Sequence, residues 1–127
     1  MKYFSVTVLA IIIGIGVFSL FQQSSNDVKE ITTTELEKQM ETDSEAIYVD
    51  VREVNEYEAG HVKGMENMPL SNFAENYSVL PKDREIVVFC RSGNRSMQAA
   101  TFLADQGYAK VTNVEGGILA WEGPVQQ

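Results

Sequence analysis

A cysteine followed by a short polar segment is the feature of this sequence best suited to chemistry. Cys90 is the only cysteine among 127 residues, and it ends an apolar run that begins at Ile86. The next six residues are Arg91, Ser92, Gly93, Asn94, Arg95 and Ser96. A helical pattern follows, so this segment leads into a helix, where free N–H groups form an anion cradle. A thiol in such a cradle has a lowered pKa, because the cradle stabilises the thiolate.

The residue types of this loop fit an anionic substrate. Gly93 and Asn94 can adopt the left-handed conformations that a tight ring of N–H groups requires. Arg91 and Arg95 add positive charge that neither pH nor burial readily removes. We therefore predict that Cys90 is a nucleophile and that residues 91–96 bind the substrate. The alternative is that Cys90 is a packed strand residue beside ordinary surface arginines.

The order of predicted elements indicates an α/β fold. Strands are expected at 28–31, 46–51, up to 68, 85–90 and 110–114, and helical segments at 32–40, 54–59, 72–76, 96–106 and 118–121. Such alternation is typical of a parallel sheet with helices on both faces, and ligands bind at the carboxyl ends of its strands. Cys90 stands at such an end. Asp50 also ends a strand, and we expect it to support the loop backbone or an arginine.

Two further positions have structural interpretations. His61 is the only histidine, but a preformed thiolate needs no strong base, so we expect a structural role for its hydrogen-bonded ring. Arg52 and Glu56 are four residues apart, and we expect their side chains to pair across the small helical turn 54–59.

Charge and composition exclude several classes of function. The chain has 10 Lys and Arg against 18 Asp and Glu, an acidic balance that argues against binding to nucleic acid or anionic lipid headgroups. One cysteine and one histidine allow no intrachain disulfide and argue against a zinc site within one chain. A positive site for an anionic substrate must therefore be local, as it is around Cys90.

The N-terminal segment differs in character from the rest. Tyr3–Phe21 is nineteen residues without a charge, and as a helix it would rise about 28 Å, close to the hydrocarbon thickness of a bilayer. We predict an anchor with a short linker over 1–26 and one domain over 27–127. Lys2 precedes the run, so the positive-inside rule places the domain outside the cytoplasm. A cleaved signal peptide, which gives a secreted protein, and a buried core helix are the alternatives.

Three segments of the sequence, 48–69, 90–96 and 114–121, carry motifs that together resemble the single-domain rhodanese (thiosulfate sulfurtransferase-like) family. The segment 90–96 is similar to that family's active-site loop, and 114–121, Val-Glu-Gly-Gly followed by Ala-Trp, is similar to its C-terminal signature. The similarity covers about 28–121. The residues that resemble the upstream signature are Tyr48-Val49-Asp50-Val51-Arg52, Glu56-Tyr57, Gly60-His61-Val62, Gly64, Asn67 and Pro69. Met65-Glu66 stands where many relatives have a small residue.

The resemblance implies a ping-pong sulfur transfer through Cys90. A donor such as thiosulfate leaves a persulfide on Cys90, and cyanide or a thiol removes the sulfur. No metal or organic cofactor is implied. Two alternatives stay open: a non-enzymatic binding module, although such domains commonly lack the cysteine, and a cysteine-dependent phosphatase or arsenate reductase. The phosphatases resemble Cys-x5-Arg, whereas here the spacing from Cys90 to Arg95 is Cys-x4-Arg.

Overall fold

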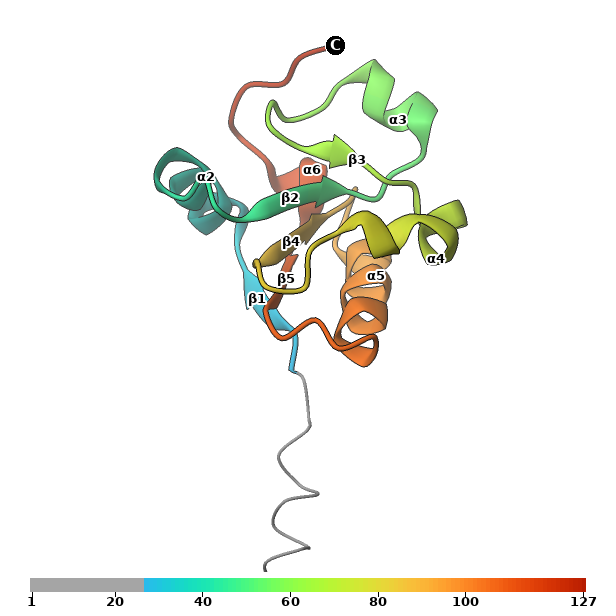
Figure 1. Cartoon of the computed structure of the whole chain (residues 1–127). Helices are drawn as coiled ribbons and strands as arrows, with labels where there is room; N and C mark the ends of the chain where they lie inside the picture. Colours follow the sequence, from blue (N-terminus) through green and yellow to red (C-terminus); the bar gives the residue numbers. More distant parts are fainter. Residues whose placement is uncertain (1–26) are drawn as a thin grey trace, which may run out of the picture.

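The fold is built on one five-stranded parallel sheet (Figure 1). The structure, a computed structural model, describes residues 27–127. The strand order is β1-β5-β4-β2-β3, and every neighbouring pair is parallel. The strands are β1 (Lys29–Ile31), β2 (Ile47–Asp50), β3 (Glu66–Asn67), β4 (Ile86–Phe89) and β5 (Val111–Val114). All four residues of the central strand β4 are buried, as its unbroken apolar run predicts.

Helices cover both faces of the sheet. They are α2 (Thr33–Thr42), α3 (Val54–Ala59), α4 (Phe73–Asn76), α5 (Asn94–Asp105) and α6 (Gly117–Ala120), with 3-10 turns at Leu70–Asn72 and Tyr77–Val79. One face packs against α4 and α5, with Val88 of β4 in that cluster. The other packs against α2 and α6, with Val87 in that cluster. Successive residues of β4 therefore point into different clusters, on opposite faces of the sheet, as the pleat requires.

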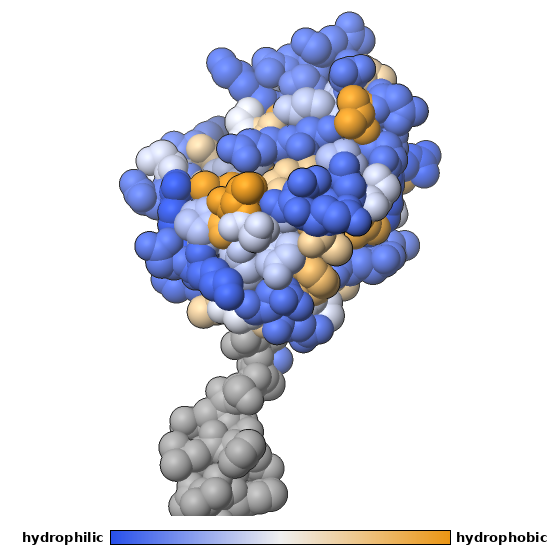
Figure 2. All heavy atoms as spheres, turned by 45° about the vertical axis from the view of Figure 1, so that its right-hand side comes forward, coloured by the Kyte–Doolittle hydropathy of each residue, from blue (hydrophilic) through white to orange (hydrophobic). Residues whose placement is uncertain are grey.

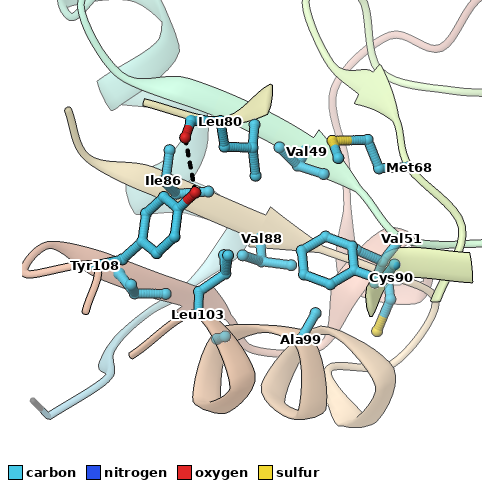
Figure 3. Close-up of a cluster of buried hydrophobic side chains, with 13 residues drawn as sticks. Val49, Val51, Met68, Leu80, Ile86, Val88, Cys90, Ala99, Leu103 and Tyr108 are labelled. Carbon is cyan, nitrogen blue, oxygen red and sulfur yellow. Dashed lines mark hydrogen bonds between the residues drawn. The ribbon is translucent and has the colours of Figure 1, made fainter. Parts of the chain in front are cut away.

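The cluster beside α5 is the larger core, and it ends at the cysteine. Figure 3 shows Val88 and Leu103 in its middle, with Cys90 at one end and Tyr108 at the other. The Tyr108 hydroxyl donates to the Leu80 carbonyl over 2.7 Å, so the polar tip of this buried ring is satisfied. The sheet and α5 thus meet through a continuous apolar layer that fixes the helix beside Cys90.

Local signals place the helix ends with small differences from expectation. Thr32 caps α2, as predicted, by accepting a hydrogen bond from the Glu35 N–H over 3.2 Å. Helix α3 has the predicted bounds, and Gly60 is its C-cap. Helix α5 begins at Asn94 and not at Ser96, so two residues expected in the loop belong to its first turn.

The surface around this core is mainly polar. Figure 2 shows a face that is largely hydrophilic, with hydrophobic side chains in small separate patches. The exposed large hydrophobic residues of the described region are scattered along the sequence: Val54, Val79, Leu119 and Val125.

The predicted N-terminal helix over Tyr3–Phe21 lies outside the described residues, and it stays a prediction together with the division at residue 26. Within 27–127, no helix is both long enough and apolar enough to cross a membrane.

Candidate active site

Cys90 lies directly after β4, at the carboxyl edge of the sheet. Its side chain is 1% exposed, and Figure 3 shows its sulfur at the end of the core, close to Val51 and Ala99. The sheet and α5 therefore form one side of the thiol's surroundings. The other side is polar, because the chain turns there from β4 into α5.

Hydrogen-bond donors surround the sulfur. The Gly93 N–H donates to Cys90 Sγ over 3.1 Å, and the Ser96 hydroxyl oxygen lies 3.2 Å from the sulfur. Burial would raise the pKa of the Cys90 thiol. Hydrogen bonds from the Ser96 side chain and from the backbone N–H groups of Ser96, Gly93 and Ser92 outweigh burial, and the pKa is lowered. The site thus favours a thiolate, the nucleophilic form of cysteine.

A left-handed glycine makes the ring of donors possible. Gly93 has φ +103° and is the N-cap of α5, and a Cβ there would come within 3.3 Å of the Gly116 nitrogen. No non-glycine residue among 27–127 has a positive φ, so Asn94 does not adopt the left-handed conformation that we expected. Asn94 is instead the first residue of α5. Gly93 alone supplies the tight bend.

The two arginines of the loop have different environments. Arg95 forms a two-point ion pair with Glu56 of α3, at 2.6 and 2.9 Å. Arg91 is exposed, and its side chain makes no ion pair or hydrogen bond within the described residues. Ser92 and Asn94 are also exposed on this rim. The charge that remains available to an incoming anion is therefore that of Arg91.

Asp50 acts on the site through Arg52 and α3. Asp50 is fully buried and pairs with Arg52, whose Nη2 lies 2.8 Å from Oδ2. Arg52 also donates to the carbonyl oxygens of Glu56, within α3, and of Gly60, at its C-terminal end. These bonds hold the helix beside Arg52. Helix α3 in turn presents Glu56 to Arg95. Asp50 thus orients Arg52, an arginine outside the loop 91–96.

This domain type is identified by comparison with known proteins. Residues 32–124 match the sequence profile described as the rhodanese-like domain. The chain belongs to the rhodanese-like family. The rhodanese-like match spans the elements that build the site, from β2 to α6.

Several rhodanese-like relatives are named for sulfur transfer. A Bacillus subtilis protein named putative sulfurtransferase YtwF is 41% identical over 97 residues, covering 76% of this chain and 93% of that protein. An Allochromatium vinosum protein named sulfurtransferase is 37% identical over 94 residues, covering 74% and 88%. The thiosulfate sulfurtransferase GlpE of Pseudoalteromonas translucida is 35% identical over 78 residues, covering 61% and 74%. Sulfurtransferase homologues thus support transferase activity broadly.

Solved rhodanese-like structures share the fold. The crystal structure of a rhodanese-like domain protein from Staphylococcus aureus has a TM-score of 0.71 at 30% identity, covering 78% of this chain and 97% of that one. A rhodanese-related protein from Thermoplasma volcanium has a TM-score of 0.69 at 33% identity, covering 77% and 97%. The predicted α/β architecture with a parallel sheet is confirmed.

Sequence reasoning missed the ion pair between Arg95 and Glu56 and assigned the wrong side-chain partner to Arg52. The predicted side-chain pair of Arg52 with Glu56 is wrong: the Glu56 carboxylate binds Arg95, and the Arg52 guanidinium binds Asp50. Four-residue spacing brings side chains together only within a helix, and Arg52 precedes α3, which starts at Val54. Arg95 also has a partner from the protein, and its predicted contact with substrate stays a prediction.

His61 lies against α3 and not in the ring around the sulfur. Its imidazole stacks on Tyr57 with 3.9 Å between ring centroids, and Nδ1 is 2.9 Å from the Tyr57 carbonyl oxygen. Within residues 27–127, no group of three or more His, Cys, Asp or Glu is arranged to hold a metal ion.

Proposed function

We propose that this rhodanese-like domain moves a sulfane sulfur from a donor such as thiosulfate to a thiophilic acceptor, cyanide or a thiol, through a persulfide on Cys90. The observation that carries the proposal is the ring of donors around Cys90 Sγ, which lowers the pKa of a thiol that is almost fully buried. The names of the relatives support the same chemistry.

In the first half-reaction, the Cys90 thiolate attacks the outer sulfur of thiosulfate. The sulfur–sulfur bond of the donor breaks, and its electron pair leaves with sulfite. The new persulfide carries its negative charge on the outer sulfur, so the step needs no proton and no external oxidant. The Gly93 N–H already donates to Sγ over 3.1 Å. The Ser96 hydroxyl, 3.2 Å away, accepts from the thiol and would donate to the thiolate, so both groups would stabilise negative charge on the sulfur.

In the second half-reaction, the acceptor attacks the outer sulfur of the persulfide. The bond between that sulfur and Sγ breaks, its electron pair returns to Sγ, and the Cys90 thiolate is regenerated. With cyanide the product is thiocyanate, and with a thiolate it is a new persulfide. The donor ring favours the returning thiolate in the same way that it favours the starting one.

The rim of the site would select the donor. Arg91 is exposed and unpaired in the described region, so it can attract a dianion into a protein of net charge −8. We expect Ser92 and Asn94, exposed beside it, to donate to the donor's oxygen atoms. Arg95 is held in place by Glu56, and its positive charge would also act directly on the negative Cys90 sulfur.

Intact mass spectrometry tests the proposal directly. The full-length chain should gain the mass of one sulfur atom after treatment with thiosulfate and lose it after treatment with cyanide. Because Cys90 is the only cysteine, no other thiol can account for the change. A chain that stays unmodified with thiosulfate, while its thiol alkylates normally, would contradict the proposal.

We also propose that the segment Tyr3–Phe21 holds the chain at a membrane with the domain outside the cytoplasm. The uncharged length of the segment and the position of Lys2 support this proposal. Full-length protein should stay with membranes through an alkaline wash, and deletion of residues 1–23 should give a soluble, active domain. Mature protein beginning near Leu20 in a soluble extracytoplasmic fraction would instead indicate a cleaved signal.

A further inference from the structure

The segment 113–119, from the end of β5 into α6, binds the active-site loop through the loop's carbonyl groups. The Ile118 N–H donates to the Cys90 carbonyl over 2.9 Å, and the Leu119 N–H donates to the Arg91 carbonyl over 3.1 Å. The Asn113 side-chain amide donates to the Gly93 carbonyl over 3.3 Å. Three of the four carbonyls from 90 to 93 are therefore held from one side.

Peptide geometry makes one of these bonds important for the sulfur. In a trans peptide the C=O and the following N–H point to opposite sides of the chain. The Arg91 carbonyl faces Leu119, so the Ser92 N–H of the same peptide faces away from α6. That N–H is one of the backbone groups that lower the Cys90 pKa. The Leu119 amide thus fixes the orientation of a donor that it does not touch.

Close packing of Gly117 holds the same peptide from a second direction. Gly117 is buried and has φ +53°. A Cβ on it would overlap the Cys90 carbonyl oxygen and would lie 2.5 Å from the carbonyl carbon and oxygen of Arg91. These neighbours are backbone atoms, so a side chain at 117 could be accommodated only if the peptides of Cys90 and Arg91 moved.

We propose that residues 117–119 are a positioning element for Cys90. The Leu119 amide and the bare Cα of Gly117 hold the Arg91–Ser92 peptide so that its N–H stabilises the negative sulfur. The inference rests on the proposed function, in which that sulfur is the thiolate or the persulfide of the transfer cycle. It assigns to α6 a part in the chemistry, although none of its side chains enters the donor ring.

The Leu119 amide can be removed without removing a helical hydrogen bond. Leu119 lies in the first turn of α6, where amides have no intrahelical acceptor, so proline there removes no helical hydrogen bond. Its side chain is 64% exposed. Leu119→Pro therefore deletes the bond to Arg91, and Leu119→Ala is the matched control that shortens the side chain and keeps the N–H.

The readout is the rate of Cys90 alkylation by iodoacetamide as a function of pH, measured on the full-length chain in a non-ionic detergent. Cys90 is the only cysteine, so the midpoint of the profile is the pKa of its thiol. We expect Leu119→Pro to raise the midpoint by about one pH unit, a tenfold change in the thiolate-to-thiol ratio. Leu119→Ala should keep the original midpoint. Equal midpoints for the two variants would overturn the proposal.

A second pair of variants separates positioning from backbone strain. Gly107 also has a positive φ, +94°, but its Cβ would meet only the end of the Lys82 side chain, at 3.6 Å. Gly117→Ala and Gly107→Ala should both lower the thermal midpoint of unfolding, and only Gly117→Ala should raise the alkylation midpoint. A rise in both, or in neither, would overturn the role of Gly117. If Gly117→Ala does not fold, the Leu119 pair decides.

Sulfur transfer distinguishes this proposal from the function on which it rests. At pH values below the alkylation midpoint, kcat/KM for thiosulfate should be about tenfold lower in Leu119→Pro than in the wild type. The difference should disappear at higher pH. A wild-type chain that transfers no sulfur would contradict the proposed function, whereas the alkylation midpoints would still show whether α6 controls the thiol.

Discussion

Arg95 and Glu56, which are 39 residues apart in sequence, form a two-point ion pair between the first turn of α5 and α3. Both nitrogens of the Arg95 fork bind the carboxylate, at 2.6 and 2.9 Å, and the two side chains are 29% and 28% exposed. The hydrogen bond from Arg95 is the main reason that the pKa of Glu56 is lowered to about 2. The pair connects the start of α5, next to Cys90, to α3, which Arg52 in turn contacts through the Glu56 and Gly60 carbonyl oxygens.

Glu56→Gln should destabilise the domain in a pH-dependent way. A carboxylate whose pKa is depressed on folding stabilises the folded state above its unfolded pKa of about 4.3, and loses this effect as pH falls through the folded pKa. We expect a loss of about 1 kcal/mol at pH 7, because the pair is partly exposed. The difference from wild type should shrink between about pH 4.5 and pH 2.

Urea unfolding at several pH values measures this difference. Glu58→Gln is the control, since Glu58 is exposed on the same helix and forms no ion pair within the described residues. A wild-type-minus-Glu56→Gln difference that does not change with pH would show that the charge of Glu56 is not what stabilises the domain.

Ser96→Ala should raise the pKa of Cys90. The Ser96 side chain is the strongest of the groups that oppose burial and lower this pKa, and a hydrogen bond to a charged group is worth about 1.5–3 kcal/mol. We expect the alkylation profile to move up by about one pH unit or more, so that the rate falls near pH 7 and recovers at alkaline pH. Thr101→Ala, on the exposed side of the same helix, should leave the profile in place. An unchanged alkylation profile in Ser96→Ala would show that this hydroxyl does not stabilise the thiolate.

Arg91→Gln should weaken binding of the anionic donor more than it slows the chemistry. Arg91 is exposed, so its attraction for thiosulfate acts through solvent and is screened by salt. We expect KM for thiosulfate to rise about three- to tenfold at low ionic strength, with kcat within about twofold. Steady-state kinetics at 20 and 500 mM salt check this, and the gap between variant and wild type should narrow at high salt. Lys82→Gln, at an exposed lysine bonded to the Gln106 carbonyl, controls for the loss of any one positive charge. If kcat alone falls, Arg91 acts on the reaction and not on capture of the donor.

Cys90→Ser should abolish sulfur transfer and keep the fold. Serine is only slightly smaller than cysteine, and its hydroxyl can form a hydrogen bond with Ser96 at the same position. The serine hydroxyl is, however, a far weaker nucleophile at neutral pH. We expect thiosulfate:cyanide transfer to fall about a thousandfold or more, while circular dichroism and the unfolding midpoint change little. Substantial transfer by a folded Cys90→Ser chain would rule out the cysteine mechanism.

The sequence was sufficient to predict where several strands and helices begin or end, because the signals for them are local. The buried run of β4, the cap at Thr32 and the stop at Gly60 depend on neighbouring residues, and each lies where the pattern indicates. The approach of Cys90 to a helix N-terminus follows from the same local order. Gly93 adopts the left-handed conformation that its residue type permits.

The partners of the charged residues could not be predicted from spacing. The pairing of Glu56 with Arg95 depends on how α3 is placed relative to α5. Arg52, which pairs with the buried Asp50, contributes to that placement because it bonds carbonyl oxygens of α3 and Gly60. The start of α5 at Asn94 has a similar origin. The Ser96 N–H in its first turn bonds to the Cys90 sulfur, and no side chain caps this helix, so its start has no cap signal in the sequence.

The length of the loop should decide between sulfur and phosphate chemistry. Gly93 and Ser96 both contact Cys90 Sγ, and Asn94 between them opens α5. A persulfide adds one sulfur atom to this ring, whereas a phosphoryl group brings three equatorial oxygens that each need donors. The native chain should therefore transfer sulfur and show no measurable hydrolysis of an aryl phosphate.

Insertion of one glycine between Gly93 and Asn94 should widen the ring, because it separates the two contacts to the sulfur by one more residue. We expect the Cys90 pKa to rise, sulfur transfer to fall about tenfold or more, and the wider cradle to admit phosphate or arsenate as an inhibitor of alkylation. A glycine inserted between Lys82 and Asp83, in an exposed turn before β4, is the control for added chain length and should change neither assay. Clear phosphatase turnover by the native chain, or unchanged sulfur transfer after the insertion at 93, would show that the size of the loop does not set the chemistry of Cys90.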